Sequence, residues 1–430
     1  MKRLFSFIAM LTAVVFLTTA ASDPYQDALK ADPYNAAGNY HPYPVPKYSD
    51  TKAPKGYTPF YVSHYGRHGS RYLIGATRYT HSTEMMDKLH DAGLLTSDGE
   101  ALRNELIAMK AAHAGQDGIL TQVGSREHQG ISSRLYKRVR KVFQQKKRRD
   151  VLVVSTPVHR VLQSAFNFTG VLKGKEPDLN FQLYSGDKYK DYLARSVPDS
   201  VREPLEEKCN AVLEEMLSEL LTGPGVGSKI FRNTGRVQEI LGDESLAKFM
   251  YTLLEESSIA KCLDIDVDPF SHFTDEEILA FGKIYNARSM YAFHRSQECG
   301  NPNNTITGIP LLLDFILKAD EALRPNSTRC ADLRFGHDSG IGPLLGTIGV
   351  EGYDTTPSLK DAWKEWPAYE YIPMGSNLQM IFYRNRQGDV IVKMLRNEKE
   401  TVIPALAPFD GPYYKWEDLR AYFADICGLD

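Results

Sequence analysis

The pattern of apolar and polar positions along the chain changes period several times, and each change predicts a different element. The stretch "YTPFYVSHYG", from Tyr57, predicts an apolar strand that breaks at Gly66. The continuous apolar run of residues 151–155 is typical of a buried strand. Further on, "SNLQMIFYRNRQGDVIVKML" alternates and turns at residues 386–388, which predicts a hairpin added to a sheet.

Helical spacing occupies most of the remaining chain. It covers residues 80–92, "LIAMKAAHAG", a long stretch from about Gly124, and the residues after Pro157. Between about residues 173 and 329 the apolar spacing is almost entirely helical, as in "VREPLEEKCNAVLEEMLSELL" and "TDEEILAFGKIYNARSMYAFHRS". Strand, turn and helix then return in "ADLRFGHDSGIGPLLGTIGV". This order predicts an α/β protein with an inserted, mostly helical lobe.

The domain boundaries follow from these changes. We expect one α/β domain from residues 57–172 and 330–430, with a helical insertion lobe at residues 173–329. Residues 22–56, rich in Pro, Tyr, Asn and Asp, are expected to form an irregular N-terminal arm on the surface.

The first 21 residues are typical of a signal peptide. Lys2 and Arg3 precede an apolar core, and small residues follow, so that cleavage is expected near Ala21. The apolar run is short for a membrane span. We therefore expect a secreted or periplasmic protein with no stable membrane association.

Composition adds constraints on partners and redox state. The chain has 42% hydrophobic and 24% charged residues and a net charge of -3, which is typical of a globular protein without bulk attraction for nucleic acid. Outside the cytosol, one or two disulfides are expected and at least one cysteine stays unpaired, with the pairing open. The sequence contains no CxxC motif and no His/Cys spacing typical of metal ligands, so we expect no metal site of that type. The sequence does not indicate an oligomeric state. The five cysteines are Cys209, Cys262, Cys299, Cys330 and Cys427.

Three segments share one form: an apolar strand, a polar turn and a helix. They are "FYVSHYGRHGSR", "VLVVSTPVHRV" and "LRFGHDSGIG". If their strands are parallel, the three turns lie at the same carboxyl edge of the sheet, where open α/β sheets bind ligands. The side chains that would meet there are Arg67, His68, Arg71, Arg160, His337 and Asp338.

This set of side chains favours chemistry on a phosphate ester. Arginine guanidinium groups offer paired donors that match phosphate oxygens. A site that only holds phosphate would not favour Asp338, since a carboxylate repels the anion, whereas a leaving alkoxide needs a proton that a carboxylic acid can supply. Two simpler roles are open: Arg160 as an ordinary cation at a helix start, and Asp338 as an N-cap.

The motifs "RHGSR", "STPVHR" and "GHDSG", in this order, resemble those of the histidine acid phosphatases, in the branch that includes phytases and multiple inositol polyphosphate phosphatases. The segment "LTQVGSREHQG" is similar to a family segment between the first two motifs, and the resemblance extends from about Tyr57 to the C-terminal hairpin. It implies a phosphoglycerate-mutase-like fold: a central mixed sheet flanked by helices, with the helical lobe inserted. It also implies hydrolysis of a small-molecule phosphate ester without a metal or other cofactor.

The resemblance also implies a role for each residue that matches a motif. His68 would be the nucleophile that becomes phosphohistidine. Asp338 would protonate the leaving oxygen and then act as base for the attacking water, so that activity is expected to be highest in acid, where Asp338 is protonated. The phosphate oxygens would be bound by Arg67, Arg71, Arg160 and His337.

Two departures from the family pattern leave the substrate open. Tyr72 and Leu73 follow the first motif, where many members have proline. His337-Asp338-Ser339 stands where inositol polyphosphate phosphatases often have His-Ala-Glu. We expect inositol polyphosphates such as phytate. The alternatives are a general acid phosphatase acting on simple or sugar phosphomonoesters, and a non-hydrolytic phosphate-binding or mutase-like relative.

Residues to which the resemblance gives no catalytic role are candidates for further substrate contacts. The basic residues 137–149 are either a solvated helix end or an attractor for polyanions. The remaining histidines of interest, His64, His128 and His294, are expected to be structural or surface residues. The possible substrate-binding residues are His159, Lys188, Lys190 and Arg195.

Overall fold

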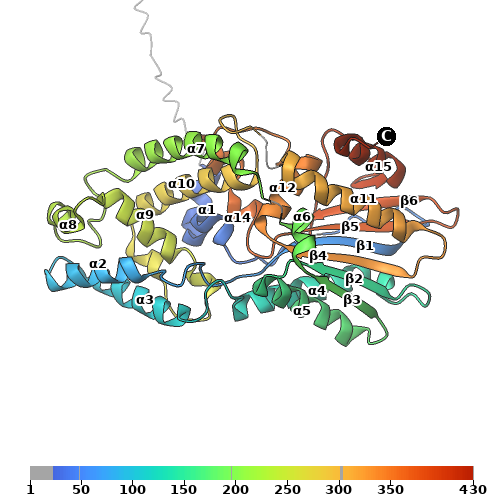
Figure 1. The fold of residues 1–430 in the computed structure, drawn as a ribbon, viewed down its shortest axis with the longest axis horizontal. Helices are drawn as coiled ribbons and strands as arrows, with labels where there is room; N and C mark the ends of the chain where they lie inside the picture. Colours follow the sequence, from blue (N-terminus) through green and yellow to red (C-terminus); the bar gives the residue numbers. More distant parts are fainter. Residues whose placement is uncertain (1–22, 48, 195, 301–303, 430) are drawn as a thin grey trace, which may run out of the picture.

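The computed structural model describes residues 23–47, 49–194, 196–300 and 304–429. The predicted signal peptide and Arg195 lie outside the described residues. Strands gather at one end of the molecule and a group of helices at the other (Figure 1). This arrangement confirms the predicted mixed α/β fold with a central sheet flanked by helices.

The described strands form one mixed sheet in the order β3-β2-β4-β1-β5-β6-β7, with β8 paired to β6. Strands β3, β2, β4 and β1 are parallel, and β5 to β8 add antiparallel pairs. The three motif-bearing strands β1, β2 and β4 are therefore parallel neighbours, as predicted. The strands are β1 Thr58–Arg67, β2 Asp150–Ser155, β3 Asn180–Ser185, β4 Arg329–Gly336, β5 Asn377–Arg384, β6 Val390–Arg396, β7 Lys399–Glu400 and β8 Tyr413–Lys415.

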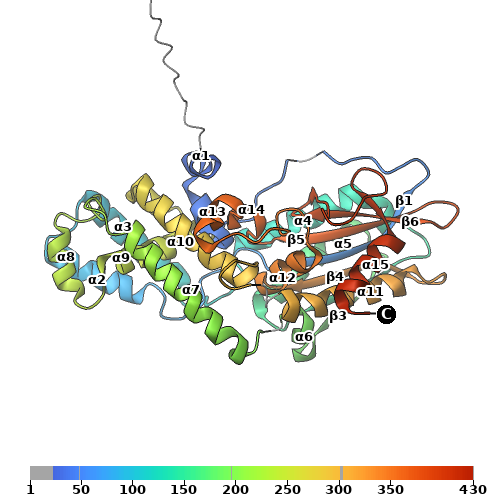
Figure 2. The same ribbon diagram turned by 90° about the horizontal axis from the view of Figure 1, so that it is seen from above.

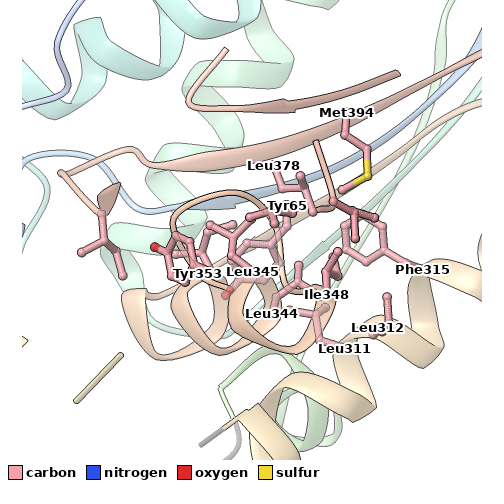
Figure 3. Close-up of a cluster of buried hydrophobic side chains, with 14 of the residues drawn as sticks. Tyr65, Leu311, Leu312, Phe315, Leu344, Leu345, Ile348, Tyr353, Leu378 and Met394 are labelled. Atoms are coloured by element: carbon pink, nitrogen blue, oxygen red, sulfur yellow. The ribbon is translucent and has the colours of Figure 1, made fainter. Parts of the chain in front are cut away.

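Helices cover both faces of this sheet. Helices α4 and α5 lie on one face, and α11, α12 and α15 lie on the other (Figure 1). On the second face, Tyr65 and Leu378 from the sheet pack with Leu311 and Leu344 from the helices (Figure 3). Apolar contact on both faces explains why β1 reads as an apolar run. The covering helices are α4 Gln122–Phe143, α5 His159–Lys175, α11 Ile309–Leu323, α12 Asp338–Ile348 and α15 Trp416–Cys427.

The helices at the other end form what we call the helical lobe, seen from a second side in Figure 2. Many of its buried residues form a second core, which includes Met86, Phe249 and Phe281, whereas Cys209 and Met216 of α7 belong to the core beside the sheet. It comprises α1 Pro24–Ala31, η1 Pro33–Tyr40, α2 Thr80–Asp91, α3 Ser97–His113, α7 Asp199–Leu220, α8 Thr234–Leu241, α9 Leu246–Ser257, η3 Ala260–Cys262, η4 Pro269–His272 and α10 Asp275–Phe293. Shorter helices connect these parts: η2 Asp187–Tyr189, α6 Lys190–Leu193, η5 Asn304–Gly308, η6 Leu359–Asp361, α13 Ala362–Glu365 and α14 Ala368–Tyr371.

The N-terminal arm differs from the prediction of irregular structure on the surface. Residues 24–31 and 33–40 are helical, and Tyr25, Leu29 and Tyr34 are buried in the core of the helical lobe. The side chain of Asp23 accepts a hydrogen bond from the backbone of Tyr25, and a proline follows the aspartate. An N-cap aspartate followed by proline is a helix-start signal, and here it outweighs the high content of turn-forming residues.

The composition of the helical lobe also differs in detail from the predicted insertion. Strand β3 lies inside residues 173–329 but pairs with β2 in the sheet. Helices α2 and α3, which precede that range, contribute to the core of the lobe. The boundaries at residues 172/173 and 329/330 stay a prediction.

Cys209 in α7 and Cys299, beyond the end of α10, form a disulfide. The other three cysteines are free thiols, and two of them, Cys262 and Cys330, are buried. Among the residues that the structure describes, no helix has both the length and the apolar character needed to cross a membrane.

Candidate active site

The loop after β1 is held by backbone hydrogen bonds to both neighbouring strands. The backbone N–H of Arg67 donates to the carbonyl of Ser376 just before β5, at 2.8 Å. The next residue, His68, donates to the carbonyl of Gly336 at the end of β4, at 3.0 Å. These contacts fix the first motif at the carboxyl edge of the sheet, as the parallel arrangement predicts.

Glu127 of α4 also holds this loop. Its carboxylate accepts hydrogen bonds from the backbone N–H of Ser70 at 2.7 Å, the hydroxyl of Ser70 at 2.6 Å and the N–H of Tyr43 at 2.7 Å. The loop and α4 lie so close that a Cβ on Gly69 would come within 2.7 Å of the carbonyl oxygen of Gly124. Both glycines are therefore required by close backbone approach.

Arg67 and Asp338 form a buried ion pair at the centre of the site. Nη2 of Arg67 lies 2.8 Å from Oδ2 of Asp338, and the arginine side chain is fully buried. Its Nη1 donates to the carbonyls of Asn39 at 2.7 Å and Ile372 at 2.8 Å. The same Oδ2 of Asp338 accepts from Nδ2 of Asn39 at 3.1 Å. The helical lobe thus reaches the catalytic edge of the sheet through Asn39.

His68 is buried, with 2% of its surface exposed, and its tautomer follows from one contact. Its Nδ1 lies 2.9 Å from the carbonyl oxygen of Gly69. Since a carbonyl oxygen only accepts, Nδ1 carries the proton and Nε2 carries the lone pair. Burial, followed by the positive charges of Arg160 and Arg67, holds the pKa of His68 well below its usual value. The lowered pKa favours the neutral form of the ring.

Two more arginines complete the cationic cluster. Arg71 lies with its guanidinium 5.2 Å from the ring centre of Tyr40. Arg160, in the first turn of α5, has a pKa lowered to about 10 by burial and by Arg71. Mutual repulsion of this kind is relieved by a bound anion. Within the described residues, the Nε donors of Arg67, Arg71 and Arg160 have no acceptor.

His337, the residue before α12, lies beside these groups. Its Nδ1 is 3.5 Å from Nη2 of Arg160, and its Nε2 is 3.2 Å from the hydroxyl of Thr156. Its backbone N–H donates to the hydroxyl of Tyr65 at 3.0 Å, which ties the turn to β1. Burial and Arg160 lower the pKa of His337 to about 4, so the ring is neutral above that pH. The rings of His68 and His337 are 5.6 Å apart.

Asp338 is held as a carboxylate. Burial alone would raise its pKa, but the charge of Arg67, followed by His337 and Arg71, outweighs this effect and lowers the pKa below the usual value. Its Oδ1 also accepts from the N–H of Ser339 at 3.0 Å, but Asp338 is the first residue of α12 and the N-cap position is His337, so the N-cap role considered for Asp338 is wrong. The structure therefore differs from the expectation that Asp338 is already protonated in moderate acid.

The six residues predicted from the three motifs thus lie together, and the comparisons with known proteins assign the family. The family described as histidine phosphatase superfamily (branch 2) matches residues 66–397. The chain belongs to this superfamily. It is an enzyme of the histidine acid phosphatase type. A comparison with curated proteins found no match.

Solved structures of similar fold include other phosphatases. The multiple inositol polyphosphate phosphatase of Bifidobacterium longum, in complex with inositol hexasulfate, is 20% identical, with a TM-score of 0.73 over 91% of this chain and 97% of that chain. The phytase from D. castellii is 16% identical, with a TM-score of 0.67 over 98% and 93%. The Hafnia alvei phytase is 13% identical, with a TM-score of 0.55 over 88% and 98%. These likenesses support the fold.

The more peripheral candidates of this histidine phosphatase lie nearer the surface. His159 is the exposed first residue of α5, next to Arg160. Lys188 and Lys190 are exposed just after β3, at the same edge of the sheet as the motifs. Lys190 pairs with Asp187 at 2.7 Å, and the Nζ of Lys188 is 4.9 Å from the centre of the Tyr189 ring. The fourth candidate, Arg195, lies outside the described residues.

The other groups considered in the sequence are the basic residues 137–149 and three histidines. The basic residues at the end of α4 precede β2 and therefore lie at the opposite, amino edge of the sheet. His64, His128 and His294 are buried and contact aromatic rings, as expected of structural residues. Among the described residues no group of His, Cys, Asp and Glu side chains could hold a metal ion.

A cavity of about 430 Å³ opens beside Ser339 and Pro343 at the start of α12. The loop after α6, helix α7 and the end of α10 form its other walls, and Arg202 is one of the lining residues. Cavities of this size are typical of small-molecule sites. Its lining includes Ser339, the residue after Asp338, but none of the six motif residues.

Sequence reasoning missed two residues of this site. Glu127 lies within a segment that resembles the family, but a single acid on a helix gives no signal of what it contacts. Asn39 belongs to an arm that was expected to be irregular. Their contacts with the motif residues depend on the tertiary arrangement of η1 and α4.

Proposed function

We propose that this enzyme hydrolyses phosphomonoesters through a phosphohistidine at His68, and that inositol polyphosphates are its main substrates. The observation that carries the proposal is the surroundings of His68. A buried, neutral imidazole lies among three arginines, one of which is paired with Asp338. This combination provides a nucleophile, an anion site and a proton carrier at one sheet edge.

In the first step, Nε2 of His68 attacks phosphorus and the bond from phosphorus to the ester oxygen breaks. Asp338 gives its proton to the leaving alkoxide. The imidazole keeps its Nδ1 proton, and the carbonyl of Gly69 stabilises the positive charge that develops on the ring. Arg67, Arg71 and Arg160 stabilise the phosphoryl oxygens in the transition state.

In the second step, water attacks the phosphohistidine and the phosphorus–nitrogen bond breaks. The Asp338 carboxylate takes the proton of the attacking water. His68 returns to its neutral form, and inorganic phosphate leaves. No further proton is required, because the proton that Asp338 lost in the first step is regained in the second.

The low pKa of Asp338 raises the question of where its first proton originates. A phosphate monoester loses its second proton at a pKa of about 6, so below that pH it arrives as a monoanion that carries a proton. Its oxygens compete with Asp338 for Arg67 and bring negative charge close to the carboxylate, and both effects raise the pKa of Asp338. The substrate proton then passes to Asp338. We expect kcat/KM to fall above about pH 6, with loss of the substrate monoanion.

The preference for inositol polyphosphates rests on two supporting observations. Several proteins of similar fold are named as phytases or as a multiple inositol polyphosphate phosphatase. In addition, the cavity beside Ser339 and the exposed Lys188 and Lys190 offer room and positive charge near the cluster. A substrate with several phosphates would use such contacts, whereas a simple aryl phosphate would not.

The test is phosphate release from inositol hexakisphosphate and from phenyl phosphate, side by side, at pH 4 to 7. We expect a higher kcat/KM for the inositol substrate and loss of both activities in His68→Ala. Equal or better turnover of phenyl phosphate would indicate a general acid phosphatase. Phosphate transfer to added alcohols without net hydrolysis would indicate a mutase-like enzyme. Full activity in His68→Ala would overturn the phosphohistidine mechanism.

Export is part of the same proposal. Lys2, Arg3 and the apolar stretch that follows have the composition of a signal peptide, with cleavage near Ala21. N-terminal sequencing of the protein recovered from the periplasm or medium should begin near Ser22. Recovery of the uncleaved chain from the cytosol would contradict this assignment.

A further inference from the structure

Asn39 makes three polar contacts at the centre of the site. Its Nδ2 donates to Oδ2 of Asp338 at 3.1 Å, and its backbone carbonyl accepts from Nη1 of Arg67 at 2.7 Å. Its Oδ1 accepts from the hydroxyl of Tyr285 in α10 at 2.9 Å. The side chain is buried, so these contacts are protected from competing water.

We propose that Asn39 is the positioning residue for the acid Asp338, supplied to the sheet edge by the N-terminal segment. This inference rests on the proposed function, in which Asp338 protonates the leaving oxygen. It gives a role in catalysis to residues 24–40, a segment that lies outside the three motifs.

The orientation of the amide follows from its partners. An ionised carboxylate only accepts hydrogen bonds, so the group of Asn39 that faces Asp338 must be the NH2. The oxygen then faces the hydroxyl of Tyr285, which can donate. Asp338 and Tyr285 therefore require the same orientation of the Asn39 amide, which is hydrogen-bonded on both sides.

The backbone of Asn39 is fixed by the packing of η1. Gly38 has a φ of 53°, and a Cβ there would come within 2.8 Å of the Tyr285 ring. The neighbouring Ala36 and Ala37 are fully buried in the helical lobe. A rigid support of this kind is what a positioning contact requires.

The contact matters most when phosphate is bound. Oδ2 of Asp338 has two partners in the described structure, Nη2 of Arg67 and Nδ2 of Asn39. A phosphate oxygen on Arg67 competes for the first of them. Asn39 then remains as the contact that keeps the carboxyl group aimed at the leaving oxygen.

The experiment compares two leaving groups. Phenyl phosphate needs a proton on its leaving oxygen, whereas 2,4-dinitrophenyl phosphate leaves as a stable anion and needs little help from an acid. For Asn39→Ala we expect kcat/KM to fall by about tenfold to a hundredfold on phenyl phosphate and by less than about threefold on the dinitrophenyl ester. The ratio kcat/KM reports the steps through phosphoryl transfer to His68 and excludes the later hydrolysis.

Two controls separate the possible failures. Asp338→Asn removes the acid and should show a larger loss with the same leaving-group dependence; equal losses on both esters in this variant would overturn the proposed role of Asp338. Asn35→Ala removes another amide of the same segment, one that donates to the carbonyl of Ala28 at 2.9 Å far from Asp338, and should leave both rates unchanged. If Asp338→Asn discriminates between the esters and Asn39→Ala does not, the role of Asn39 alone is wrong.

A second variant covers the case in which Asn39→Ala does not fold. Asn39→Asp keeps the shape of the side chain and places a second carboxyl group about 3 Å from Asp338, so the two cannot both ionise easily. We expect a new ionisation in the pH profile of kcat/KM for phenyl phosphate, with activity lost when both groups are charged. A profile of unchanged shape would overturn the proposal.

Discussion

Replacing Glu127 should destabilise the enzyme and displace His68, the proposed nucleophile. The carboxylate accepts three hydrogen bonds, two from Ser70 and one from Tyr43, and Ser70 is fully buried. A hydrogen bond to a charged acceptor contributes about 1.5–3 kcal/mol, and a buried donor left without a partner costs about 1–3 kcal/mol. Because Glu127 is only half-buried, water can enter after truncation, and we take the low end. Glu127→Ala should then lower the free energy of unfolding by about 3–5 kcal/mol.

The isosteric variant Glu127→Gln separates charge from shape. It places an NH2 group against one of the N–H donors, and we expect a loss of about 2 kcal/mol. Since the loop carries His68, and a displacement of about 1 Å can reduce catalysis a hundredfold, kcat/KM should fall in the same order, Ala below Gln below the parent enzyme.

The measurement is urea unfolding followed by tryptophan fluorescence, with phosphatase activity determined on the same samples. Glu84→Gln, on the exposed side of α2, serves as the matched control and should change neither quantity. The reasoning is refuted if Glu127→Ala unfolds within about 1 kcal/mol of the parent and keeps its kcat/KM, because the carboxylate would then not hold the loop.

Three further predictions concern packing, pH and redox state. Gly69→Ala should reduce kcat/KM more than tenfold, because its Cβ would lie 2.7 Å from the carbonyl oxygen of Gly124; unchanged kinetics would contradict that close approach. Buried His294 has a pKa of about 3, so the folded state resists protonation as the pH falls below about 6.5 while the unfolded state does not, and stability is lost on acidification. Between pH 7 and pH 5, the free energy of unfolding measured in urea should fall by about 2 kcal/mol less for His294→Phe than for the parent enzyme. An equal fall in both proteins would refute the assignment of this loss to His294. Thiol titration of the unreduced, urea-unfolded protein should find three of the five cysteines, and five would exclude the Cys209–Cys299 disulfide.

The sheet and the motif cluster were predictable because their causes are local in sequence. Residues 151–155 have an apolar pattern because β2 packs on both faces, with Val151 and Val153 in one core and Leu152 and Val154 against the other. Arg67, Arg160 and Asp338 each stand at or just after the end of a parallel strand, so topology alone brings them together. Once three such strands are parallel neighbours, the clustering of their turns follows without any knowledge of the lobe.

The rest of the architecture depends on contacts between segments distant in sequence. Nothing in the spacing of α2 and α3 shows that they pack with α9 rather than with the sheet. The pairing of Cys209 with Cys299 likewise depends on how α7 lies beside α10, and five cysteines allow many pairings. Edge strand β3 was missed because its side chains are largely exposed and therefore lack an apolar pattern.

The site therefore combines two kinds of information. The groups proposed to perform the reaction are carried by short motifs, since each follows a strand and needs only the sheet to place it. The groups that set their geometry, Asn39 and Glu127, come from an N-terminal segment and from the side of a covering helix. A hydrogen-bonding side chain in such a position has no sequence pattern of its own, because its partner is up to 299 residues away. The motifs thus predict the class of reaction, whereas the orientation of Asp338 depends on packing between the helical lobe and the sheet.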